Sequence, residues 1–339
     1  SANRKNDSNS TTHGNAATAS PKNDVLKTIK KYRYKSPKFS VDYGSAGFST
    51  GVLINRYQLY SGGSGPIMLN SESVLNGMIK LGTSDLLEDL KINGAFRIGT
   101  NLKDNEWYVN FQNLRRRIDW GISYYRNVQG LSLTDQFQSV FYPAKSFTNL
   151  YQANIAYPFN NNRSVRFSTG IRADKIVMKA VDGFSIDYPD DLKLYSVSKL
   201  EYVYDNSLNP AMNIWNGLRY KAFAEINRQV NKNNFIDKPI GFNVGFDARY
   251  YYPIHNDFIW AGRIAGDFSW GKQKIIYYLG GLDGWLMFGD NIKNDGSYRY
   301  FNELVKPAND NTYAFQSLAV NMRGFIQNIA NGNNALVIN

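Results

Sequence analysis

Between Gly241 and Tyr252, large apolar side chains occupy every second position of the chain. They are Phe242, Val244, Phe246, Ala248, Tyr250 and Tyr252, and the positions between them hold Gly241, Asn243, Gly245, Asp247, Arg249 and Tyr251. Successive side chains of a β-strand point to opposite faces of the sheet, so this pattern predicts a strand with one apolar and one polar face. The next segment repeats it. We therefore expect Phe242, Val244, Phe246, Phe258, Trp260 and Ile264 to face away from Asn243, Asp247, Arg249 and Arg263.

Similar segments recur along most of the chain and predict an all-β fold. We expect eleven strands before a long loop, over residues 38–48, 74–82, 90–99, 106–114, 119–127, 150–158, 164–178, 193–204, 216–230, 239–253 and 257–270. Short and long links alternate between them, as periplasmic turns and extracellular loops do in an antiparallel transmembrane β-barrel with lipid outside and water inside. A β-sandwich would also alternate. However, Leu, Ile and Val would dominate its core, whereas Tyr, Trp and Phe lie near these strand ends.

The charge distribution points in the same direction. The net charge is +11, which suits nucleic acid, an anionic membrane surface or a basic lumen. Many basic residues lie at alternate strand positions, which favours the lumen and leaves no expectation of nucleic acid: Arg97, Arg166, Arg172, Arg219, Lys221, Arg249 and Arg263. The cluster Arg115–Arg117 lies at a predicted periplasmic turn. It is expected to be solvated, with anionic lipid headgroups or a partner as the alternative contact.

Residues 1–34 differ in composition from the rest. They are rich in Asn, Ser, Thr and Ala and poor in large apolar residues, so they are expected to form a disordered linker or tail before a barrel at 35–339. No secretory signal peptide is recognisable. Because an outer-membrane protein must be exported, we expect the chain to belong to a longer protein.

The sequence gives no support for catalysis. The two histidines are His13, in the expected tail, and His255, in an expected turn, and there is no cysteine. No ligands are spaced for zinc or calcium. We therefore expect no enzyme, no catalytic residues, no metal site and no cofactor.

A family resemblance enters near the C-terminus. The chain reads Gly280-Gly281-Leu282-Asp283-Gly284-Trp285, then a polar insert, then Asn321-Met322-Arg323-Gly324-Phe325. In this order after an eleventh strand, the segments resemble the bacterial surface antigen superfamily of outer-membrane assembly and translocation barrels, the BamA-like proteins. The spacing is most similar to a Bacteroidota subgroup whose members often carry a TolB-like periplasmic propeller upstream.

The resemblance implies a sixteen-stranded barrel, of which this chain would supply about strands 1–12, with a long loop at 271–332 folding into the lumen. It implies that Gly280, Gly281 and Trp285 form the loop's glycine motif and that Arg323, Gly324 and Phe325 form its tip. Arg323 would pair with an acidic group inside the barrel, Gly324 would allow a tight backbone, and Phe325 would pack beneath it. The family's acid lies beyond the twelfth strand; within this chain the candidates are Glu225, Asp247 and Asp267.

The implied function is an outer-membrane barrel of a Gram-negative bacterium that handles client polypeptides or serves as a subunit of an outer-membrane machine. Its surroundings would be outer-membrane lipid and lipopolysaccharide. Two alternatives stay open: a passive pore or receptor with a basic lumen, and a membrane anchor for a periplasmic propeller.

Overall fold

The computed structural model describes residues 30, 38–48, 57–60, 67, 76–99, 104–134, 141–231, 239–255, 258–281, 300–308, 312–322 and 324–339. The chain divides into two units, Ser1–Lys38 and Phe39–Asn339. Apart from Lys30, the tail expected over residues 1–34 lies outside the described residues. The second unit carries the fold.

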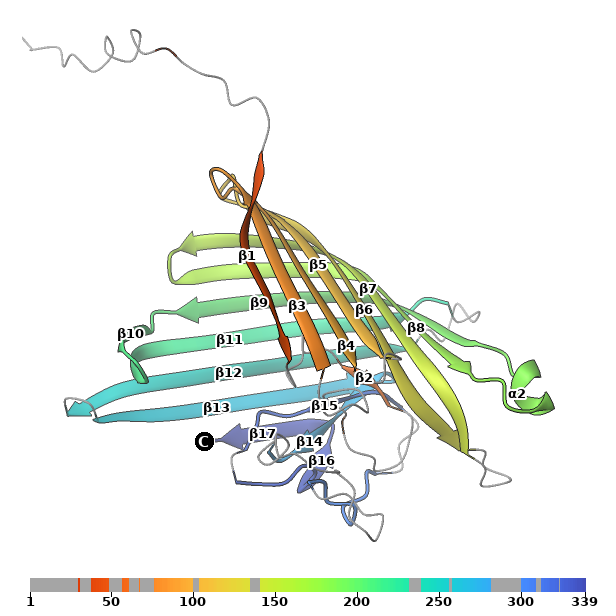
Figure 1. The fold of residues 1–339 in the computed structure, drawn as a ribbon. Helices are drawn as coiled ribbons and strands as arrows, with labels where there is room; N and C mark the ends of the chain where they lie inside the picture. The colour runs from red at the N-terminus through yellow and green to blue at the C-terminus, as the bar shows by residue number, and fades with distance from the viewer. Residues whose placement is uncertain are drawn as a thin grey trace, which may run out of the picture. The chain divides into compact units, whose positions relative to one another are not determined.

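A single thirteen-stranded sheet dominates this unit (Figure 1). Its strands are β1 (Phe39–Phe48), β3 (Asn76–Asp85), β4 (Leu90–Gly99), β5 (Asn105–Asn113), β6 (Asp119–Thr134), β7 (Phe141–Asn160), β8 (Arg163–Met178), β9 (Asp191–Asp205), β10 (Leu208–Ala211), β11 (Ile214–Gln229), β12 (Ile240–His255), β13 (Phe258–Gly271) and β17 (Asn334–Ile338). Neighbouring strands pair antiparallel throughout, and all eleven predicted strands are present. The all-β antiparallel fold is therefore confirmed.

The strands predicted at 119–127 and 150–158 are too short. Strands β6 and β7 continue into the link between them and pair from Val128–Phe147 out to Thr134–Phe141. The physical reason is visible in the sequence, where small and apolar residues continue to alternate beyond Val128. The ladder can therefore extend until the chain reaches the residues near 135–140.

The two faces of the sheet differ as the alternation predicts. On β12, Phe246 is 36% exposed on the outer face, whereas Asn243 on the inner face is 1% exposed. Phe242, Val244, Phe258, Trp260 and Ile264 are exposed on the outer face as well. The β12–β13 register pairs Phe242 with Trp270 and Arg249 with Arg263, which keeps like faces together. The predicted register is thus confirmed.

The sheet is open. Its hydrogen-bonded order runs from β1 at one edge to β17 at the other, and these two strands do not pair with each other in the described part of the chain. Strand β17 follows the long loop and pairs with β13, from Ile264–Ile338 to Phe268–Asn334. It therefore takes the place expected for the start of a twelfth long strand.

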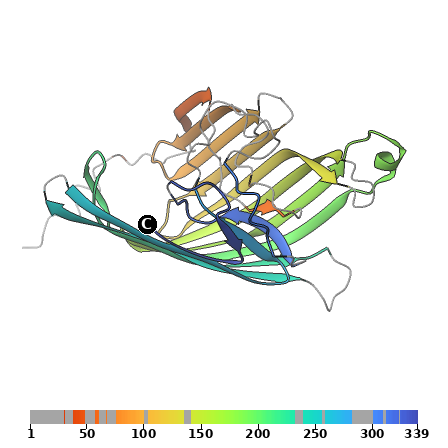
Figure 2. The same cartoon turned by 90° about the horizontal axis from the view of Figure 1, so that it is seen from below.

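A second sheet of four short strands lies on the inner face of the first, which curves around it (Figure 2). Its order is β16 (Ala330–Gly332), β14 (Lys274–Leu279), β15 (Tyr313–Leu318) and β2 (Gln58–Leu59). Strands β14 and β15 pair parallel, which the connection of more than thirty residues between them permits.

Helical structure is confined to one short element in the described residues. Helix α2 (Gly183–Asp187) begins with a capping box in which Asp182 accepts from the Ser185 backbone. No helix among these residues is long and apolar enough to cross a membrane.

Candidate functional site

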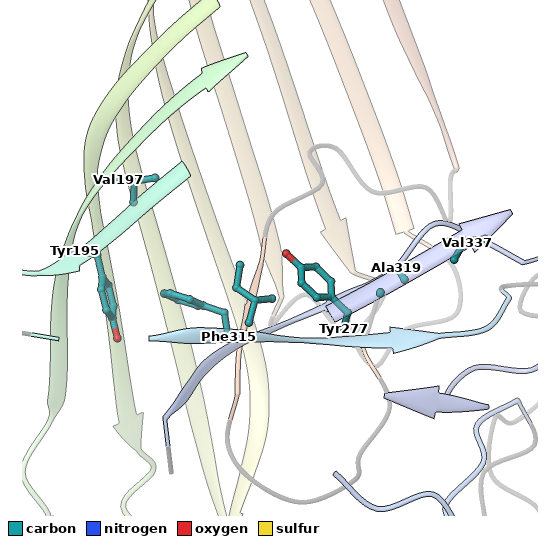
Figure 3. Packing of buried hydrophobic residues seen from close by; sticks show 8 residues of the cluster. Tyr195, Val197, Tyr277, Phe315, Ala319 and Val337 are labelled. Carbon is teal, nitrogen blue, oxygen red and sulfur yellow. The ribbon is translucent and has the colours of Figure 1, made fainter. Parts of the chain in front are cut away.

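The candidate site is the contact between the inner face of the large sheet and the segment that folds onto it. We call residues 272–333, together with residues 57–60, the insert. We call the inner face of the large sheet the wall. The side chains of the insert that face it form one apolar cluster with the large sheet. The fully buried members of this cluster include Tyr195 from β9, Tyr277 from β14 and Phe315 from β15 (Figure 3). The insert is therefore packed against the wall as a folded layer.

Strand β14 lies at the centre of the described part of the insert. Ile275 and Tyr277 face the wall, while Ile276 and Tyr278 face a second cluster with Ile67 and Phe301 on the far side. All four β14 residues are at most 2% exposed. A strand buried on both faces reads as a continuous apolar run, as the sequence from Ile275 to Leu279 does.

Polar contacts fix the insert at one place on the wall, through a group that we call the latch: Tyr57, Glu225, Asn243 and Tyr277. The Tyr277 hydroxyl donates to Asn243 Oδ1 at 2.7 Å, and Asn243 Nδ2 donates to the Tyr57 hydroxyl at 2.7 Å. Tyr57 in turn donates to Glu225 Oε2 at 3.1 Å. The chain of donors therefore runs from the insert to the wall and back, and ends on a carboxylate.

The tyrosines of the latch are buried, and burial raises their pKa values. Burial, followed by the nearby Glu225 charge, raises the pKa of Tyr57 well above its ordinary value. Burial also raises the pKa of Tyr277, with the charges of Asp267 and Glu225 adding to the effect. Both hydroxyls therefore stay protonated donors throughout the physiological range.

Arg172 of β8 makes a second attachment between wall and insert. Its Nε donates to Asp174 Oδ2 at 2.8 Å, and its second nitrogen donates to the Tyr57 backbone oxygen at 2.9 Å. The guanidinium also lies 4.6 Å from the ring centroid of Phe315. One side chain thus holds both β2 and β15, the two strands that the insert draws from opposite ends of the sequence.

The structure brings the two motifs of the resemblance together. Met322 N donates to Gly280 O at 2.9 Å. A Cβ at Gly281 would collide with the backbone oxygens of Met322 and Phe325, and one at Gly280 would collide with that of Ile326. Only glycine allows this approach. The backbone of the loop tip therefore packs directly on the paired glycines, although the tip lies about forty residues further along the chain.

The tip itself is only partly described. Gly324 has a φ of +81°, the left-handed conformation that a tight glycine turn uses. Phe325 is 47% exposed, and its backbone oxygen lies where a Cβ on Gly281 would be; that it packs beneath the tip stays a prediction. Arg323 and Trp285 lie outside the described residues.

The three candidate acids have different surroundings. Glu225 belongs to the latch and also accepts from Asn227 at 3.0 Å. Asp247 is held by two guanidinium forks, with Arg263 at 2.9 and 2.8 Å and Arg249 at 3.3 and 3.1 Å. Asp267 makes no hydrogen bond or ion pair to another described side chain. Of the three, it is the one whose oxygens are left for a further partner.

Beyond the insert, the inner face is wetter and basic. Lys199 pairs with Glu201 at 2.8 Å, and the Asp247 group carries two arginines for one carboxylate. These side chains are about a fifth to a third exposed. No group of described residues could hold a metal ion.

Sequence reasoning named Glu225 as a candidate and placed Asn243 on the polar face, but it missed Tyr57 and Tyr277. The run Ile275–Leu279 could have indicated a buried strand, because five consecutive apolar β-formers suit no half-exposed strand. No sequence signal marks Tyr57, whose role depends on a contact 168 residues away.

Comparison with known proteins adds no relative to this description, since no family model matches the chain and no curated protein matches it either.

Proposed function

We propose that the chain is the larger part of an outer-membrane β-barrel of the BamA-like assembly and translocation superfamily, and that the insert is its plug. The barrel would be completed by strands beyond β17, and its outer face would be covered by lipid. It would act on polypeptides in transit or serve a larger outer-membrane machine.

One observation carries the proposal: an open antiparallel sheet is apolar outside and polar inside, and a long loop folds back onto the polar side. Open sheet edges are not stable in lipid, which is why further strands are required. A soluble sandwich would instead bury its apolar face, whereas here Trp260 and Phe258 remain 54% and 65% exposed. The meeting of Gly280 and Gly281 with the loop tip supports the family assignment.

The test is conductance of the full-length protein in planar bilayers. We expect the wild type to enter the bilayer and to conduct little, because the insert lies on the inner face and would block the lumen of the completed barrel. Removing the insert's tip, residues 321–325, should open a large channel. A large, stable conductance already present in the wild type would contradict the plug, and failure to insert into bilayers would contradict the barrel.

A passive anion-selective pore is the second candidate. The uncovered part of the inner face favours it, since Arg249 and Arg263 share one carboxylate and Lys199 and Lys221 lie close to Asp267. Reversal potentials in a salt gradient distinguish the two: a steady, anion-selective current in the wild type supports the pore. If the wild type carries no current and an anion-selective current appears only after the tip is deleted, the plug is supported.

A further inference from the structure

Three arginines that form no ion pair with a described carboxylate lie at one end of the strands of the large sheet. Arg116 and Arg117 lie in the turn between β5 and β6, and Arg163 begins β8 after the turn from β7. We call these three residues the arginine rim. None of them forms an ion pair with a described residue, whereas the adjacent Arg115 lies 3.6 Å from Asp89.

Two members of the rim are fixed in place by tyrosines. The Arg117 guanidinium lies 5.0 Å from the centroid of the Tyr157 ring, and the Arg163 guanidinium lies 5.5 Å from that of Tyr204. Arg117 also donates to the Phe159 backbone oxygen at 3.4 Å. Phe159 lies just before the β7–β8 turn and Arg163 just after it. Arg117, through its bond to Phe159, and Arg163 therefore lie on the two sides of the same turn.

Arg117 and Arg163 lie on the outer side of the sheet. Arg163 alternates in phase with Phe167 and Ile171, which are 41% and 57% exposed on the outer face. Tyr157 is in phase with Ile155 and Phe159, which are likewise exposed on that face. The rim therefore borders the apolar surface that we assign to lipid, and it does not face the basic interior.

Two lysines at the opposite strand ends are paired instead: Lys175 lies 2.5 Å from Asp190 and Lys193 lies 3.1 Å from Asp191. At the arginine rim, ring faces hold the guanidiniums of Arg117 and Arg163, whose five N–H donors meet no described carboxylate. A guanidinium with free donors beside an apolar surface matches a phosphate at the membrane–water boundary.

We propose that the arginine rim binds anionic phospholipids, whose headgroup phosphate is not balanced by a choline cation, in the leaflet that faces the short turns. This inference rests on the proposed function, because it requires the apolar outer face to be in a bilayer. Arg117 and Arg163 would each direct a fork at a phosphate, with Tyr157 and Tyr204 at the level of the headgroups. Arg116, exposed in the turn, adds charge that attracts anionic lipid to the site.

The experiment measures lipid selectivity at the protein surface. The full-length protein is reconstituted into phosphatidylcholine bilayers that contain spin-labelled phosphatidylglycerol or spin-labelled phosphatidylcholine. The association constants of the two labels are then compared. The test variant is Arg117→Gln/Arg163→Gln. The matched control, Lys175→Gln/Lys193→Gln, removes the same amount of charge at the opposite ends of the strands.

We expect the wild type to prefer phosphatidylglycerol and the control to keep that preference. The test variant should lose most of it, since a basic side chain at an anionic surface contributes roughly fivefold in association. Equal loss in both variants, or no preference in the wild type, would overturn the inference. The Arg117→Lys/Arg163→Lys variant, which keeps the charge but not the fork, should retain only part of the preference.

Two further measurements are needed. One distinguishes lipid phosphate from free phosphate as the ligand, and the other distinguishes loss of lipid binding from loss of membrane insertion. Excess inorganic phosphate, compared with chloride at the same ionic strength, should leave the preference unchanged; abolition by phosphate would mean a site for the free anion and would overturn the lipid assignment. Insertion is scored independently by the mobility difference between folded and heated protein. Insertion without lipid preference refutes the arginine rim alone, whereas failure to insert refutes the proposed function as well.

Discussion

The latch allows a sharp test with two neighbouring tyrosines. Tyr277 and Tyr278 are adjacent on β14 and both are at most 2% exposed. The Tyr277 hydroxyl donates to Asn243 at 2.7 Å, whereas the Tyr278 hydroxyl is buried without a hydrogen-bond partner in the described part of the structure. Replacing either residue with Phe keeps the ring and removes one oxygen. The two variants therefore differ mainly in the bond that is lost.

The expected magnitudes follow from that difference. Tyr277→Phe leaves Asn243 Oδ1 buried without its donor, and a buried polar atom left unpaired costs about 1–3 kcal/mol. The equilibrium constant for opening of the insert should therefore rise roughly fivefold to a hundredfold. Tyr278→Phe removes a hydroxyl that makes no such bond, so its effect should lie near zero or be slightly stabilising.

The assay is protease cleavage within the insert of the reconstituted protein, under conditions in which opening and closing are faster than cleavage. The cleavage rate then reports the equilibrium population of the open form. We expect faster cleavage in Tyr277→Phe and an unchanged rate in Tyr278→Phe. Equal rates in the two variants would refute the idea that the latch holds the insert on the wall.

Three other predictions use the same protein. Raising the pH should release the insert, because the pKa values of Tyr57 and Tyr277 lie above the ordinary 10.0: their stabilisation is fully present below pH 10 and is lost as the pH passes through the raised values. The protease assay repeated across pH would show this, and a release centred near neutrality would contradict it. Gly281→Ala should loosen the tip by about 1–3 kcal/mol through its collision with two backbone oxygens. Gly47→Ala, where a Cβ meets nothing, should have no such effect in denaturant titrations. Phe246→Arg should destabilise the protein in bilayers by about 2–4 kcal/mol if the outer face contacts lipid near mid-membrane, and an unchanged unfolding midpoint in lipid would argue against that placement.

The strands were predictable because their signal is local. From Phe242 to Tyr252 the alternation itself specifies which face each side chain takes, and a shift of one residue would have exposed Asn243 and buried Phe246.

The insert was not predictable to the same degree. Its position in the chain and the importance of its paired glycines followed from the resemblance, but the parallel pairing of Ile275 with Phe315 did not. Nor does any local pattern announce that Tyr57 completes the latch. These contacts are decided by which distant segments fit one another, and neither periodicity nor propensity carries that information.

The pairing of β2 with β15 also bears on the order in which the chain folds. Gln58 and Gln316 are 258 residues apart, whereas each hairpin of the large sheet joins strands that are close in sequence. Contacts of such long range form slowly, since the intervening loop must close before they stabilise anything. The hairpins can therefore assemble while Arg172, Glu225 and Asn243 still face water. The insert is then the last element to settle, and the polar side of the sheet stays open to solvent until that moment.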